Sequence, residues 1–340
     1  MPAKKRKLSP AKERELAKEQ KSKDSAPCKA PTWPQWQTKV QKVRKRNLSK
    51  VCRGWLAHVP DIESPGCAPR ETIGTIADIN DALNRVPIKG ELIEPLNASR
   101  DIVLHEGYYL AHKAIHVEMS CARAVKQGFH TWAIVDAYQA SLFALGSIMC
   151  LLGLTVERHN NDFILLDVWG ANPHLVGDLP HTDYPQDQIH FIRFKTLDHY
   201  HKWALLKRTL RTLETDLPLV TFLNEALTGR DEKEFSKHRN NVHYISNHWI
   251  ADDLLKIDPH GPVRKANTCQ HVYEHIVQGT PAGAVYLMCG LIELICEITK
   301  PLTASQILKH ESNLLDRRLE ATKGLIEFDW HTLLTDRPWA

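Results

Sequence analysis

A run of twenty nearly apolar residues, AYQASLFALGSIMCLLGLTV (137–156), constrains this chain more than any other feature. Gln139 and two serines are its only clearly polar side chains. A helix that is hydrophobic on every side either spans a membrane or lies at the centre of a bundle. Both flanks of the run are amphipathic, and the later apolar run 282–298 carries Glu293 and Glu297. We therefore expect core helices and no contact with a membrane.

Further helical patterns surround these runs and predict a mainly α fold. One long pattern begins at Ser99 and stops at Gly128, a residue type that commonly ends helices. Another covers roughly 130–153, and the chain closes with helices at about 268–299, with a break near Gly279-Thr280-Pro281, and at 303–324. These elements predict an up-and-down helical bundle within a domain that covers most of the chain.

The least regular part of the predicted domain follows the long apolar run. DFILLDVWG (162–170) is the only convincing strand signal, and a loop rich in Pro, His and Asp continues to about residue 186. We therefore expect one long irregular insertion at about 157–186. The next stretch, QIHFIRFKTLDHYHKWALLKRTLRTLE (188–214), is predicted to form a helix with a basic face.

Charge divides the chain into a basic tail and a mildly acidic body. Residues 1–50 hold 16 Lys/Arg against 4 Asp/Glu, whereas the remaining residues hold 28 basic and 36 acidic groups. We expect residues 1–60 to form a basic, Trp-containing arm that is largely disordered alone, ahead of a helical domain over 70–340. Aromatic rings among cations suit single-stranded RNA, and they equally suit an arm docked on the acidic body. The residues predicted to contact nucleic acid are Trp36, Lys42, Arg44, Lys45, Arg46, Arg193, Lys195 and Lys202.

The stretch FSKHRNNVHYISNHW (235–249) carries the candidate chemistry. Arg239 and His243 are four residues apart, so their side chains share one face of a helix. An arginine stabilises the negative charge that develops on a phosphorane, and a histidine transfers protons near neutral pH. In this scheme Asn240 positions the phosphate and Tyr244 donates a hydrogen bond. The 2′-hydroxyl of RNA serves as nucleophile, so the reaction needs no metal. The same pattern also fits a solvent-facing helix.

Two helical motifs resemble the HEPN superfamily, the higher eukaryote and prokaryote nucleotide-binding domain. The matching residues are Ala137, Tyr138 and Ala140 in an Ala-Tyr-x-Ala helix, and Arg239, Asn240 and His243 in a later Arg-Asn…His helix. The resemblance implies a helical bundle, action on RNA and a homodimer whose two motifs share one cleft. Family ribonucleases usually place more residues between the arginine and the histidine than the three found here. That departure keeps open a catalytically silent binding or assembly module.

Other classes of chemistry lack their sequence signals. The pairs His112/His116 and His271/His275 have spacings that can chelate zinc, but no third ligand stands at a known distance, so we predict no metal site. Gly-rich phosphate loops are absent, which argues against ATP hydrolysis and dinucleotide chemistry. The eight cysteines form no Cys-x-x-Cys pair and several lie in apolar runs, which is typical of a reduced, cytoplasmic protein.

The sequence thus predicts a cytoplasmic HEPN-like protein directed at RNA. The leading hypothesis is a metal-independent endoribonuclease of the toxin or antiviral defence type, which uses no cofactor. The alternative is a catalytically silent helical interaction module that binds nucleic acid or a partner protein through its basic arm.

Overall fold

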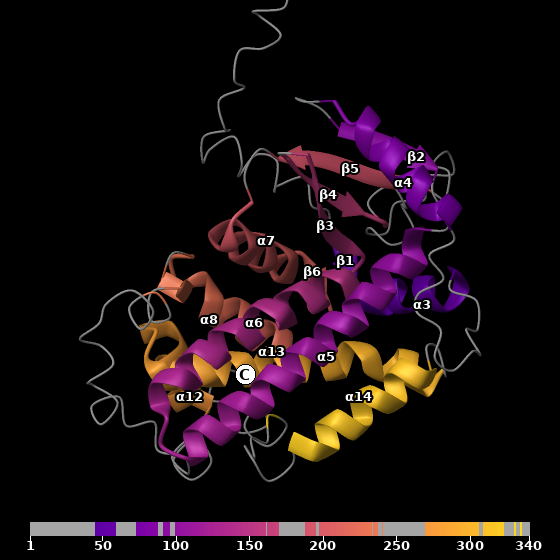
Figure 1. Cartoon of the computed structure of the whole chain (residues 1–340). Helices are drawn as coiled ribbons and strands as arrows, with labels where there is room; N and C mark the ends of the chain where they lie inside the picture. The colour runs from indigo at the N-terminus through magenta and orange to yellow at the C-terminus, as the bar shows by residue number, and fades with distance from the viewer. Residues whose placement is uncertain are drawn as a thin grey trace, which may run out of the picture.

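Helices make up most of the part of the chain that the structure describes, which confirms the mainly α prediction (Figure 1). Figure 1 shows a helical body with a small sheet at one end. The computed structural model describes residues 45–58, 73–87, 91–95, 99–160, 162–169, 188–194, 197–232, 234–236, 240, 269–305, 309–322, 330 and 334.

A hairpin of two long helices forms the centre of the body. Helix α5 (Ser99–Lys126) and helix α6 (His130–Leu151) meet at a tight turn in which Gly128 has a φ of 80°. Glycine adopts this left-handed backbone conformation at no steric cost, which is why it commonly follows the last turn of a helix. The predicted helix end at Gly128 is confirmed, since α5 stops at Lys126. Ser147 of α6 donates a hydrogen bond to the Gly107 carbonyl of α5 at 2.7 Å, which satisfies a hydroxyl inside the apolar contact.

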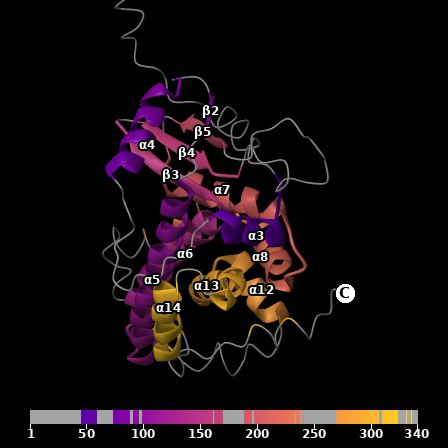
Figure 2. The same ribbon diagram turned by 90° about the vertical axis from the view of Figure 1, so that its right-hand side faces the viewer.

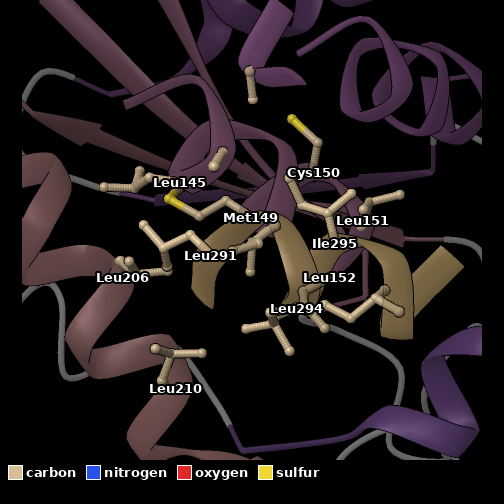
Figure 3. Packing of buried hydrophobic residues seen from close by; sticks show 14 of the residues in the cluster. Leu145, Met149, Cys150, Leu151, Leu152, Leu206, Leu210, Leu291, Leu294 and Ile295 are labelled. Carbon is tan, nitrogen blue, oxygen red and sulfur yellow. The ribbon is translucent and has the colours of Figure 1, made fainter. Parts of the chain in front are cut away.

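Helix α13 (Pro281–Ala304) packs along the hairpin and completes the core. Figure 3 shows Met149 of α6 beside Leu291 and Leu294 of α13, with Leu206 reaching in from a neighbouring helix. These side chains are all almost fully buried. Each such leucine or methionine contributes about 1.5–3 kcal/mol through burial, so the apolar runs in the sequence are explained by the core they form.

Two helices, α6 and α13, are long and apolar enough to cross a membrane by length and composition. Within their most apolar windows, 67% of α6 and 72% of α13 are buried inside the fold. That extent of burial is what a core helix of a bundle shows, as the sequence predicted.

A four-stranded antiparallel sheet covers the end of the hairpin where α6 stops. Its strand order is β2-β5-β4-β3, with register pairs such as Leu92–Phe191 and Leu165–Ile192. Helix α4 (Ile73–Arg85) packs against the sheet, and its Leu83 carbonyl accepts a hydrogen bond from Arg193 (Figure 2). The strands are β2 (Glu91–Pro95), β3 (Leu154–His159), β4 (Asp162–Asp167) and β5 (Gln188–Phe194).

The sheet corrects two sequence predictions. The strand at 162–167 was predicted, but the helix expected from residue 188 begins only at His199, because 188–194 form β5. Apolar side chains on both faces of β5 are buried, including the adjacent Phe191 and Ile192, which point to opposite faces. An inner strand covered on both faces lacks the alternation that identifies strands in a sequence. The predicted insertion at about 157–186 therefore begins with a β-hairpin, and residues 170–187 lie outside the described part.

Part of the predicted basic arm belongs to the folded body. Helix α3 (Leu48–His58) buries Trp55 completely, and its indole donates a hydrogen bond to the Leu151 carbonyl at 2.7 Å. Just before α3, strand β1 (Arg46–Asn47) pairs in parallel with β6 (Leu213–Glu214). The arm prediction thus fails for residues 45–58, because Trp55 anchors them in the core. Residues 1–44 lie outside the described part.

Shorter helices close the remaining faces of the bundle. Asp198 caps α7 through a reciprocal pair of hydrogen bonds with His201, a capping box that fixes where the helix starts. The break predicted at Gly279-Thr280-Pro281 separates α12 from α13 and is confirmed. These elements are α7 (His199–Arg211), α8 (Pro218–Thr228), the 3₁₀ turn η1 (Glu234–Ser236), α12 (Cys269–Gln278) and α14 (Lys309–Thr322).

Candidate functional site

The predicted catalytic residues fall almost entirely outside the described part of the chain. Arg239, His243 and Tyr244 lie there, and only Asn240 is described, as a half-buried helical residue. What the structure does describe is the chain that leads into this motif, and it lies in a well-defined pocket.

The approach to the motif is anchored by aromatic stacking. Phe235 in η1 stacks on Trp203 of α7, with ring centroids 4.3 Å apart and an interplanar angle of 15°. Both rings are almost fully buried. Such pairs contribute about 0.5–1.5 kcal/mol beyond the burial of their area. The stacking holds the backbone four residues before Arg239 against α7.

A buried arginine covers the other face of Phe235. The Arg230 guanidinium carbon lies 4.4 Å from the centroid of the Phe235 ring, and only 7% of Arg230 is exposed. Its Nε atom is shielded from solvent and has no hydrogen-bond partner in the described part of the chain. Burial lowers the pKa of Arg230 from its usual value, and the charge of Glu234 opposes that shift.

The backbone around Arg230 is held by a lysine. Lys207 of α7 donates a hydrogen bond to the Arg230 carbonyl at 2.7 Å and forms a 2.8 Å ion pair with Glu232. Within the described segments Glu232 thus pairs with Lys207 and forms no ion pair with Arg230.

The Ala-Tyr-x-Ala helix contributes its tyrosine to the same place. Tyr138 of α6 is almost fully buried, and its hydroxyl lies 3.0 Å from Nδ1 of the exposed His199. The hydroxyl therefore sits at the boundary between the core and solvent. A phenol beside an imidazole can donate or accept one hydrogen bond according to the histidine tautomer.

A small cavity joins these side chains. It has a volume of about 20 Å³, enough for one guest the size of a water molecule. Residues from α6, α7, α13 and the η1 region meet there, so segments far apart in the sequence converge. The polar and aromatic side chains that line it are Tyr138, Ser141, Trp203, Arg230, Phe235 and Thr280.

The break between α12 and α13 supplies one wall of the cavity. Thr280 caps α13 by accepting a hydrogen bond from the Gly283 amide at 3.0 Å, and its hydroxyl lies 2.7 Å from Nδ1 of His275. His275 packs against His271 with ring centroids 4.4 Å apart. Burial and the neighbouring His271 lower the pKa of His275, and the charge of Glu274 opposes that shift.

The basic residues predicted to bind nucleic acid do not form one described surface. Trp36, Lys42, Arg44 and Lys195 lie outside the described part, whereas Lys45 is exposed and Lys202 is half-buried on α7. Two assignments are corrected by their positions. Arg46 is buried in an ion pair with Asp167, and Arg193 on β5 lies near Asp162 at 3.5 Å and bonds the Leu83 carbonyl. The fold itself occupies both guanidinium groups, so neither presents a free charge to RNA.

Histidine pairs of zinc-like spacing do not converge into a metal centre in the described part of the chain. No group of three or more His, Cys, Asp or Glu side chains there has positions that could hold an ion. His271 and His275 face each other and Tyr286, an aromatic arrangement with centroids about 6 Å from that ring. The pair is therefore part of the packing between α12 and α13.

A second group of buried titratable side chains lies between α5 and α13. Glu118 is half-buried, and its Oε2 atom is shielded from solvent. Burial and the charge of Glu293 raise the pKa of Glu118 to about 7. Burial also raises the pKa of the nearby thiols Cys121 and Cys289 well above the usual value. Thiols of this kind stay protonated and unreactive, so they are core residues.

A groove of mixed polar and aromatic character lies at the α5–α6 turn. It has a volume of about 500 Å³. Phe129 and Trp132 at its rim are 53% and 46% exposed, an unusual exposure for large aromatic residues. Its lining residues are His116, Met119, Ser120, Arg123, Ala124, Gln127, Phe129, Trp132 and Asp136.

Sequence reasoning found Tyr138 through its motif but missed the rest of the pocket. Arg230 follows Gly229 at the end of α8, and only its burial distinguishes it from an ordinary loop arginine. No family model matches this chain, and neither the curated proteins nor the solved structures contain a match. The HEPN resemblance therefore stays a prediction, and the site is interpreted from its own chemistry.

Proposed function

We propose that this protein acts on RNA as a metal-independent endoribonuclease of HEPN-like type, in a toxin or antiviral defence role. Arg239 stabilises the charge on the phosphorane and His243 transfers protons. Asn240 positions the phosphate and Tyr244 donates a hydrogen bond. The protein works in the cytoplasm as a homodimer in which two copies of the motif share one cleft.

One observation supports this proposal above the others. The Ala-Tyr-x-Ala motif and the approach to the Arg-Asn motif share one pocket, because Tyr138 and Phe235 both line it. Nearly a hundred residues separate these positions in the sequence. The two halves of a catalytic arrangement must lie near each other, and the shared pocket supports this proposal because it brings Tyr138 to the residue four positions before Arg239.

A second candidate function is a binding module without catalysis. The groove at the α5–α6 turn favours it, because Phe129 and Trp132 expose aromatic area that a monomer usually buries. The short Arg–His spacing of three intervening residues favours it as well. In this function the basic residues 1–50 bind nucleic acid or an acidic partner, with an affinity that salt weakens.

An RNA cleavage assay in EDTA separates the two functions. We expect the wild-type protein to cleave single-stranded RNA, and Arg239→Ala and His243→Ala each to lower the rate at least about 100-fold, the usual contribution of a general acid or base. His248→Ala, in the same stretch, serves as the matched control and should retain activity. Cleavage that survives both test substitutions would refute the nuclease assignment. RNA binding without cleavage, lost on deletion of residues 1–50, would establish the binding module.

A further inference from the structure

Two exposed aromatic rings lie at the turn between α5 and α6, at the end of the hairpin opposite the sheet (Figure 1). The most exposed large apolar side chains in the described part of the chain are Phe129 and Trp132, at 53% and 46%. Exposed apolar residues that are scattered singly are ordinary, but these two are three residues apart and line one groove. Exposed aromatic area beside a groove is typical of a binding surface.

The backbone that carries both rings is held in a defined conformation. The Phe129 amide donates a hydrogen bond to the Ala124 carbonyl at 2.8 Å, which ties the turn to the last turns of α5. The Gly128 amide donates to the Val125 carbonyl at 3.2 Å, and the two bonds together form a Schellman motif. The residues on either side of Trp132 are fully buried. A ligand that stacks on these rings therefore meets a preorganised backbone, which lowers the entropy cost of binding.

The groove is large enough for an organic ligand. Its volume of about 500 Å³ lies within the range of about 300–1,000 Å³ that is usual for ligand sites. Residues from both helices of the hairpin line it, with His116 and Arg123 on α5 and Trp132 and Asp136 on α6. The groove thus offers flat apolar surface and polar groups at the same place.

The charged groups in the groove favour an anionic ligand. Arg123 is exposed and forms no ion pair within the described ranges, so its guanidinium is accessible to an oxygen anion. Asp136 alone is acidic among the described residues that line the groove, and it is half-buried. Burial raises the pKa of Asp136, and a hydrogen bond from Ser120 opposes that shift. The accessible charge beside the two rings is therefore positive.

We propose that this groove binds single-stranded RNA, with one base stacked on Trp132, a neighbouring nucleotide packed on Phe129, and a phosphate of the same strand paired with Arg123. Every base has a π face, and aromatic rings combined with cations are the usual binding surface for single strands. The exposed His116 and Gln127 side chains offer hydrogen bonds to the base edges. The identity of the strand as RNA rests on the proposed function, whereas the stacking and the phosphate contact do not.

The groove holds the strand and takes no part in the chemistry. Trp132 precedes Tyr138 by six residues on α6, which is about 9 Å along the helix axis. Tyr138 lines the pocket that also contains Phe235, four residues before Arg239. The rings therefore lie a short distance along one helix from the candidate site, which suits a surface that holds the strand while cleavage takes place elsewhere.

Fluorescence anisotropy with two labelled strands tests the stacking on the full chain. One strand is 2′-O-methyl oligouridylate, in which the nucleophile of the proposed cleavage is blocked, and the other is an abasic strand of equal length. We expect Trp132→Ala to weaken binding of the uridylate strand roughly 5- to 150-fold, the range for one lost base–aromatic stack, and to leave the abasic strand unchanged. Ile93→Ala, which truncates a 44% exposed side chain on the sheet, is the matched control and should change neither affinity.

The salt dependence of the affinity tests the phosphate contact. Each phosphate that a protein neutralises on a single strand contributes about 0.7 to the slope of log K against log salt concentration. Arg123→Gln should lower the slope by about that amount for both strands. Arg211→Gln, which removes an exposed arginine at the end of α7, should leave the slope unchanged.

The outcomes decide between RNA and another occupant of the groove. If Trp132→Ala does not fold, Trp132→Leu carries the test, because leucine keeps apolar volume and removes the π face. Equal losses on the uridylate and abasic strands, or no loss on either, would overturn the proposal and leave the groove to a protein partner. An unchanged salt slope for Arg123→Gln would likewise overturn the phosphate contact.

The binding result is independent of catalysis. If the wild type never cleaves RNA but Trp132 still determines the affinity for the uridylate strand, the nuclease function fails and the stacking groove stands. If Arg239→Ala abolishes cleavage while Trp132→Ala leaves the affinity unchanged, the groove fails and the nuclease function stands.

Discussion

The pocket at Arg230 and the region around Glu118 both bury charge, but they handle it in opposite ways. Glu118 faces Glu293 across α5 and α13, and its pKa of about 7 shows that it can take up a proton and become neutral. Arg230 has no such option, because a guanidinium does not lose its proton in proteins. The comparison teaches that a buried acid can become neutral by binding a proton, whereas a buried arginine keeps its charge and depends on stabilising contacts such as the ring of Phe235.

The largest expected effect concerns the wall of the Arg230 pocket. Trp203→Ala removes a fully buried indole that stacks on Phe235, and we expect it to lower the free energy of unfolding by about 3–5 kcal/mol. Urea unfolding followed by circular dichroism would measure this loss as a lower midpoint at constant slope. Trp132→Ala is the matched control, because its indole is 46% exposed and its loss should cost roughly 1 kcal/mol or less. Equal losses for the two variants would show that the stacked pair is not part of a rigid pocket.

The second prediction addresses the acidic region directly. The pKa of Glu118 is raised from 4.5 to about 7 in the folded protein. Below about pH 4.5 the group is protonated in both states and has no effect on stability. As the pH rises from there to about 7, the unfolded chain ionises first, so the folded state loses stability on the order of 3 kcal/mol.

Glu118→Gln removes this pH dependence without removing the side chain. We expect the variant to be more stable than the wild type above pH 7 and nearly equal to it at pH 4, as measured by urea unfolding over that range. Glu320→Gln, an exposed carboxylate on α14, is a control that should leave the pH profile unchanged. A wild-type profile that is flat between pH 5 and 7.5 would contradict the account of Glu118.

The smallest expected effect tests the rim of the Arg230 pocket. Tyr138→Phe keeps the buried ring and removes only the hydroxyl that lies 3.0 Å from His199. The free energy of unfolding should fall by about 0.5–1.5 kcal/mol, the usual net value of one hydrogen bond. Chemical denaturation at pH 7 measures this change, and Tyr109→Phe on the half-buried face of α5 provides a comparison. A loss well above this range would mean that the hydroxyl supports the pocket through more than its bond to His199.

The helices were predictable from the sequence because each has its own local signal. The turn at Gly128 and the break at Gly279-Thr280-Pro281 have the residues that end and start helices, and both lie where they were predicted. Strand β5 was not predictable, because Phe191 and Ile192 are adjacent and both buried, so the alternation of a strand is lost. Fold class thus followed from periodicity, while the sheet depended on pairing between distant segments.

The candidate site was predictable only in part. Tyr138 belongs to a motif contained within one helix, so the sequence alone identifies it. The surroundings of Arg230 include Thr280 and Phe235, which come from other elements and are brought together only by the fold. A sequence shows the charge of an arginine but not whether an acidic partner folds against it. The same limit explains Arg46, which looked like part of a basic arm and is instead paired with the buried Asp167.

The edges of the sheet have a consequence for self-association. Edge strands can template unwanted pairing with another chain when they are long, flat and apolar. Strand β2 is five residues long and ends in Pro95, which has no backbone N–H, and strand β3 carries Glu157 and Arg158 on the opposite edge. Neither edge is suited to continue the sheet into a second molecule. Both edges therefore disfavour the strand-to-strand pairing from which fibrous aggregates grow.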